Sequence, residues 1–387
     1  MDLLEEAKGI LPLLKEYRRT IHGYAEVGLD TPKTNAFIEK ALYENGITPS
    51  PCGCGVYATI GEGKGGILLR ADTDALPLEE ASSLSFAAKG NSCHACGHDM
   101  HSAMLLGAAV LLSKRKDTLP YAITLMFQPA EEILKGALSM IEDNILKNEP
   151  CFAYALHVMT ATDLPTGTLV VAPTGKVTAA SDFFSVSFHG QGAHGAMPER
   201  AANPLIPASR ALLALNDLAD SPHLTEKEAL LTVCMMEGAK AYNVIPSTAI
   251  LGGSFRTHDE EARTYLLKRI PALCQEIGAP YGICTCFSEE AHCPPLQMNA
   301  VARERALAQI RSLCAAVPIK ELPPFTAKPR GGSEDFAYVS ERIPSCFFSL
   351  AAGGVKDGYS HPLHHPAVRF DEGALAYGAA ALAAVAL

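Results

Sequence analysis

The sequence lacks any dense cluster of lysine and arginine, and its formal net charge is −10. Proteins that bind nucleic acid usually present a basic stripe, so this absence argues against that class. The apolar stretches are short or interrupted by charged residues, and the alanine-rich segment after Asp371 is too short to span a bilayer. The first residues, MDLLEEAKGI, have neither the basic flank nor the cleavage site of a signal peptide. We therefore expect a soluble, cytoplasmic protein that binds neither nucleic acid nor membranes.

Disulfide bonds are not expected either, although the chain contains 12 cysteines. In a large chain without a secretion signal, free thiols or metal ligands are more frequent than bridges. One residue separates Cys52 from Cys54, and one separates Cys284 from Cys286, which is too little for an unstrained bridge within either pair. We expect most of these cysteines to be reduced.

The patterning of the first half predicts an α/β domain. The 387 residues are enough for roughly two domains of about 100–200 residues each, and the 48% hydrophobic fraction can form a sizeable core. Residues 3–46 show apolar positions at helical spacing, and a strong helical pattern covers 101–116. Three continuous apolar runs occur at 66–72, 122–128 and 152–158. Such continuous runs are typical of strands buried on both faces of a parallel sheet.

The pattern changes near residue 180. Predicted strands cover 182–190, 229–238, 248–258 and 281–289, and predicted helices cover 203–218 and 259–278. The order β-α-β-β-α-β is that of a small antiparallel sandwich. Helical and short apolar segments resume after about residue 293. We therefore predict a discontinuous domain of residues 1–179 and 294–387, with a mainly parallel sheet flanked by helices, and an inserted α+β domain of residues 180–293.

Acidic and imidazole side chains follow the predicted buried strands of the α/β domain. They are Asp72, Asp74, Glu131, Glu132 and His157. In open α/β sheets, ligands bind outside the carboxyl ends of the strands. The segment CHACGHDMH precedes the helix that connects two of these strands, so Cys96 and His98 can face the same crevice.

This combination of side chains points to metal chemistry. Thiolate, imidazole and carboxylate groups together suit Zn²⁺ or a neighbouring transition metal and are poor ligands for Mg²⁺ or Ca²⁺. Because neighbouring side chains diverge, one of Glu131 and Glu132 can coordinate a metal ion while the other stays free. A free carboxylate beside the metal is the general base of metal-assisted hydrolysis. The sequence therefore predicts a metal-dependent hydrolase.

Several motifs, in order along nearly the whole chain, resemble those of the M20 metallopeptidase clan. They are RADTDALPLEE, CHACGHDMHSAMLLGAA, FQPAEE with KGALSMI, HGQGAHGAMPE, YNVIPSTAILGGSFRT and GGSEDFAY. Within the clan they resemble the aminoacylase-like branch, which includes hippurate hydrolases, N-acyl-amino-acid amidohydrolases and auxin-conjugate hydrolases. Two departures are visible: Ala25 precedes Glu26 where the family has proline, and Cys93 stands at a position that is more often apolar.

The resemblance implies a site with two divalent cations, Zn²⁺, Mn²⁺ or Co²⁺. Cys96 and His98 match a Cys-Gly-His ligand pair in which the thiolate bridges the two metals. Glu132 and His157 match the next two ligands, and Glu131 matches the general base.

The last ligand comes from SHPLHHP, which offers His361, His364 and His365; counting back from FDE in the family pattern favours His364. The resemblance also implies a homodimer in which His194 reaches the substrate of the other subunit. By the same resemblance, four residues match family positions that lie near the substrate: Asn243, Arg256, Gly332 and Ser333. The implied reaction is hydrolysis of the amide of an N-acyl amino acid to a carboxylate and a free amino acid.

Other interpretations stay open. Cys93 and Cys96 could form a redox pair, and a structural zinc site could use Cys93, Cys96, His98 and His101. Asp72 could be a turn residue, Asp74 more readily orients a metal ligand, and Asp99 could cap a helix. The alternative functions are a dipeptidase of the same clan and, in a different class, a metal-binding or redox module without catalysis.

Overall fold

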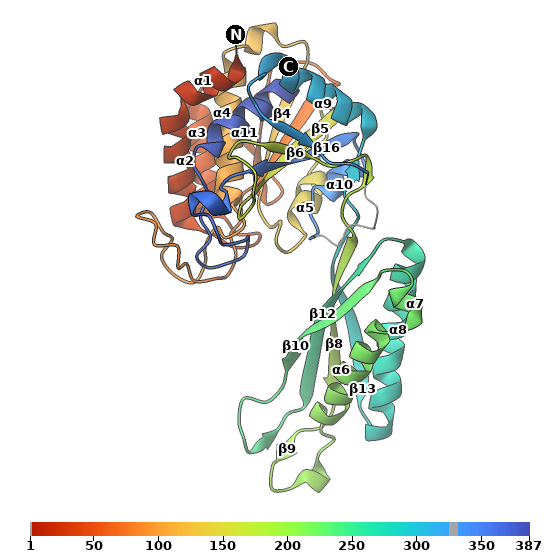
Figure 1. Cartoon of the computed structure of the whole chain (residues 1–387). Coiled ribbons are helices and arrows are strands. Elements are labelled where there is room, and N and C mark those ends of the chain that lie inside the picture. Colours follow the sequence, from red (N-terminus) through yellow and green to blue (C-terminus); the bar gives the residue numbers. More distant parts are fainter. Residues whose placement is uncertain (1, 325–331) are drawn as a thin grey trace. The chain divides into compact units, whose positions relative to one another are not determined.

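The structure, a computed structural model, describes residues 2–324 and 332–387 and divides into two compact units (Figure 1). The large unit contains residues 2–177, 296–324 and 334–387, and the small unit contains 178–295 with 332 and 333. Each unit has its own buried core. The domain boundaries expected from the sequence, after residues 179 and 293, remain our proposal for the ends of an inserted domain.

The large unit is built on an eight-stranded sheet with the strand order β1-β2-β4-β3-β5-β16-β6-β15. These strands are β1 Pro49–Cys52, β2 Gly55–Ile60, β3 Ile67–Asp72, β4 Ile123–Gln128, β5 Phe152–Met159, β6 Leu169–Val171, β15 Ile319–Glu321 and β16 Ser345–Ala351. In the middle of the sheet, β3 is parallel to β4 and β5, and β5 is parallel to β16. A short pair, β7 Gly175–Lys176 with β14 Gln297–Met298, lies outside this sheet. The mainly parallel sheet with its helices confirms the predicted α/β class.

The helices of the large unit come from the chain on both sides of residues 178–295. They are α1 Leu3–Gly9, α2 Leu11–Tyr24, α3 Pro32–Glu44, α4 His98–Ser113, α5 Gly136–Glu142, α9 Ala300–Leu313, α10 Ala337–Ser340 and α11 Ala374–Val385. Helix α4 is buried on all sides, and the alanine-rich α11 packs against it. A Cβ on Gly378 would lie 2.2 Å from the Sδ of Met104, so a side chain at this position would have to displace the Met104 side chain. None of the helices in residues 2–324 and 332–387 is both long and apolar enough to cross a membrane.

The small unit contains the predicted β-α-β-β-α-β order. Its main sheet has the order β10-β12-β8-β13, and every neighbouring pair is antiparallel. Its elements are β8 Ala180–His189, β9 Ala193–His194, α6 Leu205–Ala219, α7 Pro222–Thr225, β10 Leu230–Glu237, β11 Val244–Ile245, β12 Thr248–Thr257, α8 Glu260–Gly278 and β13 Cys284–Cys293. Alternate residues of β8, such as Phe184 and Phe188, enter the core beneath α6 and α8. This alternation explains the period-two pattern of residues 182–190.

Candidate metal centre

The predicted site residues of the large unit lie where three neighbouring parallel strands end. Because β4, β3 and β5 are adjacent in the sheet, their carboxyl ends meet at one edge. Asp72 is the last residue of β3, and His157 lies near the end of β5. Glu131 and Glu132 follow β4 through Ala130, which has a φ of 61°, a left-handed conformation that turns the chain.

A tight turn brings Cys96 and His98 to the same edge. Helix α4 begins at His98, three residues before its predicted start, and Gly97 caps it with a φ of 86°. A Cβ on Gly97 would lie 2.4 Å from Cγ2 of Val158, so both the conformation and the close approach require glycine. The turn places the Cys96 thiol and the His98 imidazole, which only Gly97 separates in the chain, at the start of a buried helix.

The other four predicted ligands converge around the Cys96 sulfur. Its Sγ lies 3.3 Å from Nε2 of His157 and 3.3 Å from Nε2 of His364. Glu132 Oε1 lies 3.5 Å from His364 Nε2 and 3.9 Å from His98 Nε2. Two groups have ligand atoms that are mutually close enough for one cation: Cys96, His98 and His157, and Cys96, Glu132 and His364. The thiol is common to both groups, which is the arrangement that two bridged cations need.

Of the three histidines in residues 361–365, His364 is the one that approaches the thiol. Its backbone N–H donates to the carbonyl of Ala95 at 2.9 Å, and its φ of 64° turns the ring toward Cys96. His361 and His365 instead stack on one another with ring centroids 4.2 Å apart. The hydrogen bond from His364 to Ala95 thus joins the C-terminal segment to the turn that carries Cys96 and His98.

Hydrogen bonds orient the other imidazoles. His157 Nδ1 donates to the carbonyl of Val158 at 2.7 Å, and His98 Nδ1 lies 3.2 Å from Asp74 Oδ1, which leaves both Nε2 atoms directed at the cluster. Asp74 also accepts from the backbone N–H groups of Glu131 and Glu132, at 3.1 and 3.2 Å. Burial lowers the pKa of His157 to about 3, so this ring carries a lone pair at neutral pH. Asp74 thus fixes the positions of His98, Glu131 and Glu132 relative to one another.

The donor set fits divalent cations. His98 Nε2 and Glu132 Oε1 are buried and have no hydrogen-bond partner within the described parts of the chain. A buried polar atom without a partner costs about 1–3 kcal/mol, which a bound cation offsets. Burial raises the pKa of the Cys96 thiol well above its usual range, and a cation would reverse this because a coordinated thiol loses its proton. Cys96, His98, Glu132, His157 and His364 are therefore the residues that would hold the cations.

Glu131 lies beside these ligands. Its carboxylate, His98 and Glu132 have ligand atoms within 4.8 Å of one another, and the residue is only 7% exposed. Burial raises the pKa of Glu131 well above its usual range, and the nearby carboxylates of Glu334 and Asp335 raise it further. A carboxyl group in this position can accept and release a proton at the cluster.

Three neighbours of the cluster have other partners. His101 Nδ1 bonds Asp72, and its Nε2 accepts from the N–H of Val158 at 2.8 Å, so neither ring nitrogen is available to a metal. This geometry disfavours the structural zinc site that includes His101. Asp99 bonds Arg18 and His22 rather than capping its own helix. Cys93 is buried in the hydrophobic core, and all the cysteines are free thiols.

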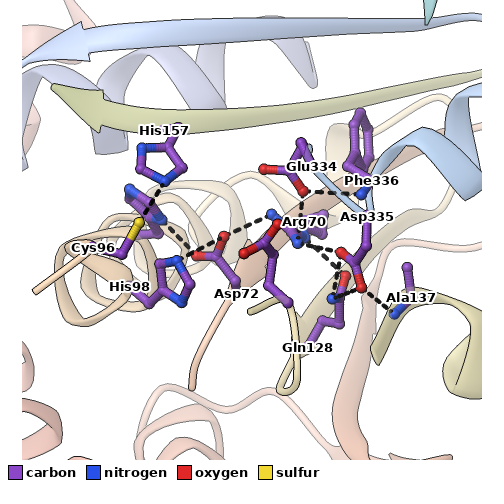
Figure 2. A network of polar contacts seen from close by, with 12 residues as sticks. Arg70, Asp72, Cys96, His98, Gln128, Ala137, His157, Glu334, Asp335 and Phe336 are labelled. Atoms are coloured by element: carbon purple, nitrogen blue, oxygen red, sulfur yellow. Dashed lines mark hydrogen bonds and ion pairs between the residues drawn. The ribbon is translucent and has the colours of Figure 1, made fainter. Parts of the chain in front are cut away.

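A buried ionic network adjoins the cluster (Figure 2). Arg70 of β3 contacts Asp72, Gln128, Glu334 and Asp335, all of which are buried. All four residues lie in motifs that carry the family resemblance, but the sequence did not predict a role for any of them. One signal was present: an arginine inside a strand that is buried throughout needs carboxylate partners. The signal does not say which carboxylates those are.

The remaining predicted residues belong to the small unit. His194 of β9 and Asn243, next to β11, are exposed neighbours at one two-stranded sheet, because Val244 pairs with His194 and the N–H of Gly195 donates to the Asn243 carbonyl at 2.8 Å. Arg256 lies on β12 opposite Ser181 of β8. Gly332 is exposed and Ser333 is half-buried. The structure thus brings His194 and Asn243 together and puts Arg256 on another sheet.

Comparisons with known proteins agree on one family. The profile described as peptidase family M20/M25/M40 matches residues 68–387. An N-acetyl-L-cysteine deacetylase of Bacillus subtilis (strain 168) is 38% identical over 92% of this chain and 83% of its own length. The IAA-amino acid hydrolase ILR1-like 6 of Arabidopsis thaliana is 33% identical over 96% of this chain and 79% of its own.

Solved structures are similar to this chain over nearly its whole length. The YXEP protein of Bacillus subtilis, described as a dinuclear metal binding peptidase from the M20 family, has a TM-score of 0.73 and 28% identity, with 98% of each chain covered. A putative aminohydrolase from methicillin resistant Staphylococcus aureus has a TM-score of 0.80 and 28% identity, over 100% of this chain and 98% of that one.

Proposed function

The chain belongs to peptidase family M20/M25/M40, and we propose that it hydrolyses the amide bond of N-acyl amino acids to a carboxylate and a free amino acid. The observation that carries this proposal is the convergence of five donor side chains, two of them with orphaned buried atoms, beside the carboxyl group of Glu131. The similarity to deacetylases of N-acetylcysteine and to hydrolases of amino acid conjugates supports this substrate class.

Two divalent cations, when bound, would polarise the scissile carbonyl and lower the pKa of the attacking water. We propose Zn²⁺, Mn²⁺ or Co²⁺, since thiolate, imidazole and carboxylate donors suit all three. Cys96 and His98 would hold them with Glu132, His157 and His364, and both groups of close donors include the Cys96 thiol.

Glu131 moves the proton in this proposal. One carboxylate oxygen accepts a proton from the attacking water and later donates it to the nitrogen of the departing amine. The backbone bond from the Glu131 N–H to Asp74 fixes the start of this side chain, so the carboxyl group stays beside Glu132 and His98. The low exposure of Glu131 keeps bulk water from competing for the proton.

The small unit would complete the substrate site in a homodimer. We assign to His194 of the partner subunit the donation of a hydrogen bond to the oxygen of the reacting carbonyl, a contribution of about 3–4 kcal/mol for such donors. Asn243 and Arg256 would bind the substrate carboxylate, and Gly332 and Ser333 would line the site. The exposure of both His194 and Asn243 at one two-stranded sheet supports a role at an interface. Twelve free thiols support a cytoplasmic location.

The test is a panel of N-acetyl, benzoyl and indole-acetyl amino acids, with dipeptides beside them, assayed with each metal. We expect hydrolysis of N-acyl amino acids, and Glu131→Gln should reduce kcat by about 10²–10⁴-fold with metal content unchanged. Cleavage of dipeptides alone would favour the peptidase alternative. Full activity of Glu131→Gln would remove the assignment of the base.

Mixed dimers test the role of His194. Neither His194→Ala nor Glu131→Gln should be active alone, but mixing them should form hybrids with one intact site. Recovered activity is expected if the histidine crosses the dimer interface. Its absence, with hybrid formation verified by native mass spectrometry, would place the function of His194 within its own subunit.

A further inference from the structure

Asp72 is a carboxylate that adjoins the candidate metal ligands without being one of them. Its Oδ2 lies 3.6 Å from His98 Nε2, the ligand nitrogen that has no hydrogen-bond partner in residues 2–324 and 332–387. Atoms of Asp72, His98 and His101 are close enough together for a single cation. By distance alone, Asp72 could therefore join the cluster.

Two contacts hold Asp72 away from this role. Oδ2 accepts a hydrogen bond from Arg70 Nη1 at 2.8 Å, and Oδ1 bonds Nδ1 of His101. Both carboxylate oxygens are thus engaged, and the residue is fully buried. Because His101 is fixed at its other nitrogen by the N–H of Val158, that contact cannot shift toward the cluster.

Arg70 is itself held from the opposite side. Its Nη2 contacts Glu334 at 3.0 Å and Asp335 at 2.8 Å, and its Nε donates to Gln128 at 2.9 Å. Asp335 is anchored in turn by the N–H of Ala137 at 2.9 Å. Figure 2 shows Asp72 between His98 and this guanidinium. The guanidinium, which is 1% exposed, cannot turn away from Asp72 without losing charged partners that water cannot replace.

Whether the Asp72 carboxylate joins the predicted ligands matters, because it would change the chemical type of the donor set. Without Asp72, the cluster is rich in thiolate and imidazole, which favour Zn²⁺ and its neighbours. An added carboxylate would make the set harder and raise the coordination number, which favours Mn²⁺ relative to Zn²⁺. The contact between Arg70 and Asp72 therefore decides between two different donor sets.

We propose that Arg70 sets the cation preference of this centre by withholding the carboxylate of Asp72 from it. The inference rests on the proposed metal centre, but it concerns a residue that touches no ligand directly. Arg70 is a positioning residue, and its effect is on the ratio of two affinities. A purely structural role would weaken the binding of both cations together.

The main variant combines Arg70→Gln with Glu334→Gln, which removes one charge of each sign and so preserves the charge balance of the buried network. The full-length apoprotein is equilibrated with Zn²⁺ and Mn²⁺ in competing chelator buffers, and the bound metals are measured. We expect the preference to move toward Mn²⁺ by about 10- to 100-fold, the range typical of residues that position metal ligands. The visible absorbance of the Co²⁺ form should weaken as the coordination number rises.

A triple variant tests the cause. Adding Asp72→Asn removes the extra ligand and should return the preference close to the wild-type value. An unchanged preference in the folded double variant, or a shift that persists in the triple variant, would overturn the inference. Arg70→Lys provides the conservative comparison: it keeps the charge but cannot reach Asp72 and Glu334 together, so its shift should be intermediate.

Arg263→Gln is the matched control, because Arg263 pairs with a buried aspartate in the small unit and should not alter the preference. A shift in this control as large as that of the double variant would also count against the inference. Failure of the wild-type protein to bind either cation would refute the metal centre itself, which is a different result from an unchanged preference.

Discussion

Two clusters of acidic and imidazole groups, one in each unit, have donors close enough to hold a metal ion, but they differ in what lies among them. In the small unit the donors are Asp182, Glu289 and His292, and Arg263 enters the group. Its Nε donates to Asp182 at 2.9 Å and its Nη2 contacts Glu289 at 2.8 Å. Within the described residues of the large unit, no lysine or arginine contacts Cys96, His98, Glu132, His157 or His364.

The difference shows how a buried ion-pair network is distinguished from a metal centre. Burying carboxylates requires a compensating positive charge. In the small unit, a guanidinium supplies it by contacting two of the three donors, Asp182 and Glu289. In the large unit, Arg70 stands behind Asp72 rather than among the predicted ligands. Unsatisfied atoms alone do not separate the clusters, because Asp182 Oδ2 lacks a hydrogen-bond partner among the described residues just as His98 Nε2 and Glu132 Oε1 do. Distance between donors is therefore a weaker criterion than the location of the nearest arginine.

The largest difference between the clusters should appear on removal of one donor from each. Cys96→Ala should abolish hydrolysis and weaken metal binding by more than the roughly 100-fold that loss of an outer partner can cost, because both donor groups use its thiol. His292→Ala should leave the metal content unchanged. Metal analysis after dialysis in chelator buffer measures both. Release of metal by His292→Ala would contradict the distinction between the two clusters.

Breaking the ion pair of the small unit should act on stability alone. Asp182→Ala removes the fully buried partner of Arg263 and should lower the free energy of unfolding by about 3–5 kcal/mol, as loss of one member of a buried pair does. Metal content should stay at the wild-type level. Denaturant unfolding measures the first quantity. A loss below about 1 kcal/mol, the range of exposed pairs, would mean that water already reaches Asp182.

A third charged group, formed by His22, Asp99 and Glu80, sharpens the comparison. Its titratable residue, His22, is not a predicted metal ligand. Burial opposes the charge of His22, but hydrogen bonds to Asp99 and Glu80 raise the pKa of its imidazole to about 9. The folded state thus binds this proton more tightly than the unfolded state, whose pKa is about 6.5. The stabilisation is complete below about pH 6.5 and is lost as the pH rises through about 9.

The expected size of this contribution is up to about 3 kcal/mol, from the difference between the two pKa values. It is measured as the difference in unfolding free energy between the wild type and His22→Gln at about pH 6 and about pH 10. A difference that is the same at both pH values would show that His22 is neutral in the folded protein.

The smallest effect is expected where water surrounds the charges. Lys40 and Glu44 are 3.7 Å apart on α3, with side chains that are 70% and 59% exposed. Lys40→Ala should change the unfolding free energy by no more than about 0.5 kcal/mol. Thermal unfolding at low and high salt measures this baseline. An effect as large as that of Asp182→Ala would remove the contrast between buried and exposed pairs.

Much of the fold was predictable because the signals were local. Continuous apolar runs predicted β3, β4 and β5. The change to alternating apolarity near residue 180 predicted β8. The start of α4 was predicted three residues late, since Cys96-Gly97-His98 carries no helical pattern and its geometry depends on the packing of Gly97 against Val158.

The candidate site was predictable to the extent that its residues follow strands. Asp72, Glu131 and His157 lie near the ends of adjacent strands, so their convergence follows from the sheet. The role of Arg70 was not predictable in the same way. Its partner Asp335 is 265 residues distant, and nothing in the local pattern of either segment indicates the other.

The sequence by itself determined the α/β class and the kinds of donor available, because periodicity and side-chain chemistry are properties of neighbouring residues. The family pattern favoured His364 among the three C-terminal histidines, but only the tertiary structure decided that its ring meets the thiol and on which side of Asp72 a guanidinium stands. Both outcomes depend on contacts between segments that the chain brings together only when the sheet has formed. The physical reason is that a buried charge is stabilised by whatever lies within a few ångströms of it, and sequence distance sets no limit on that neighbour.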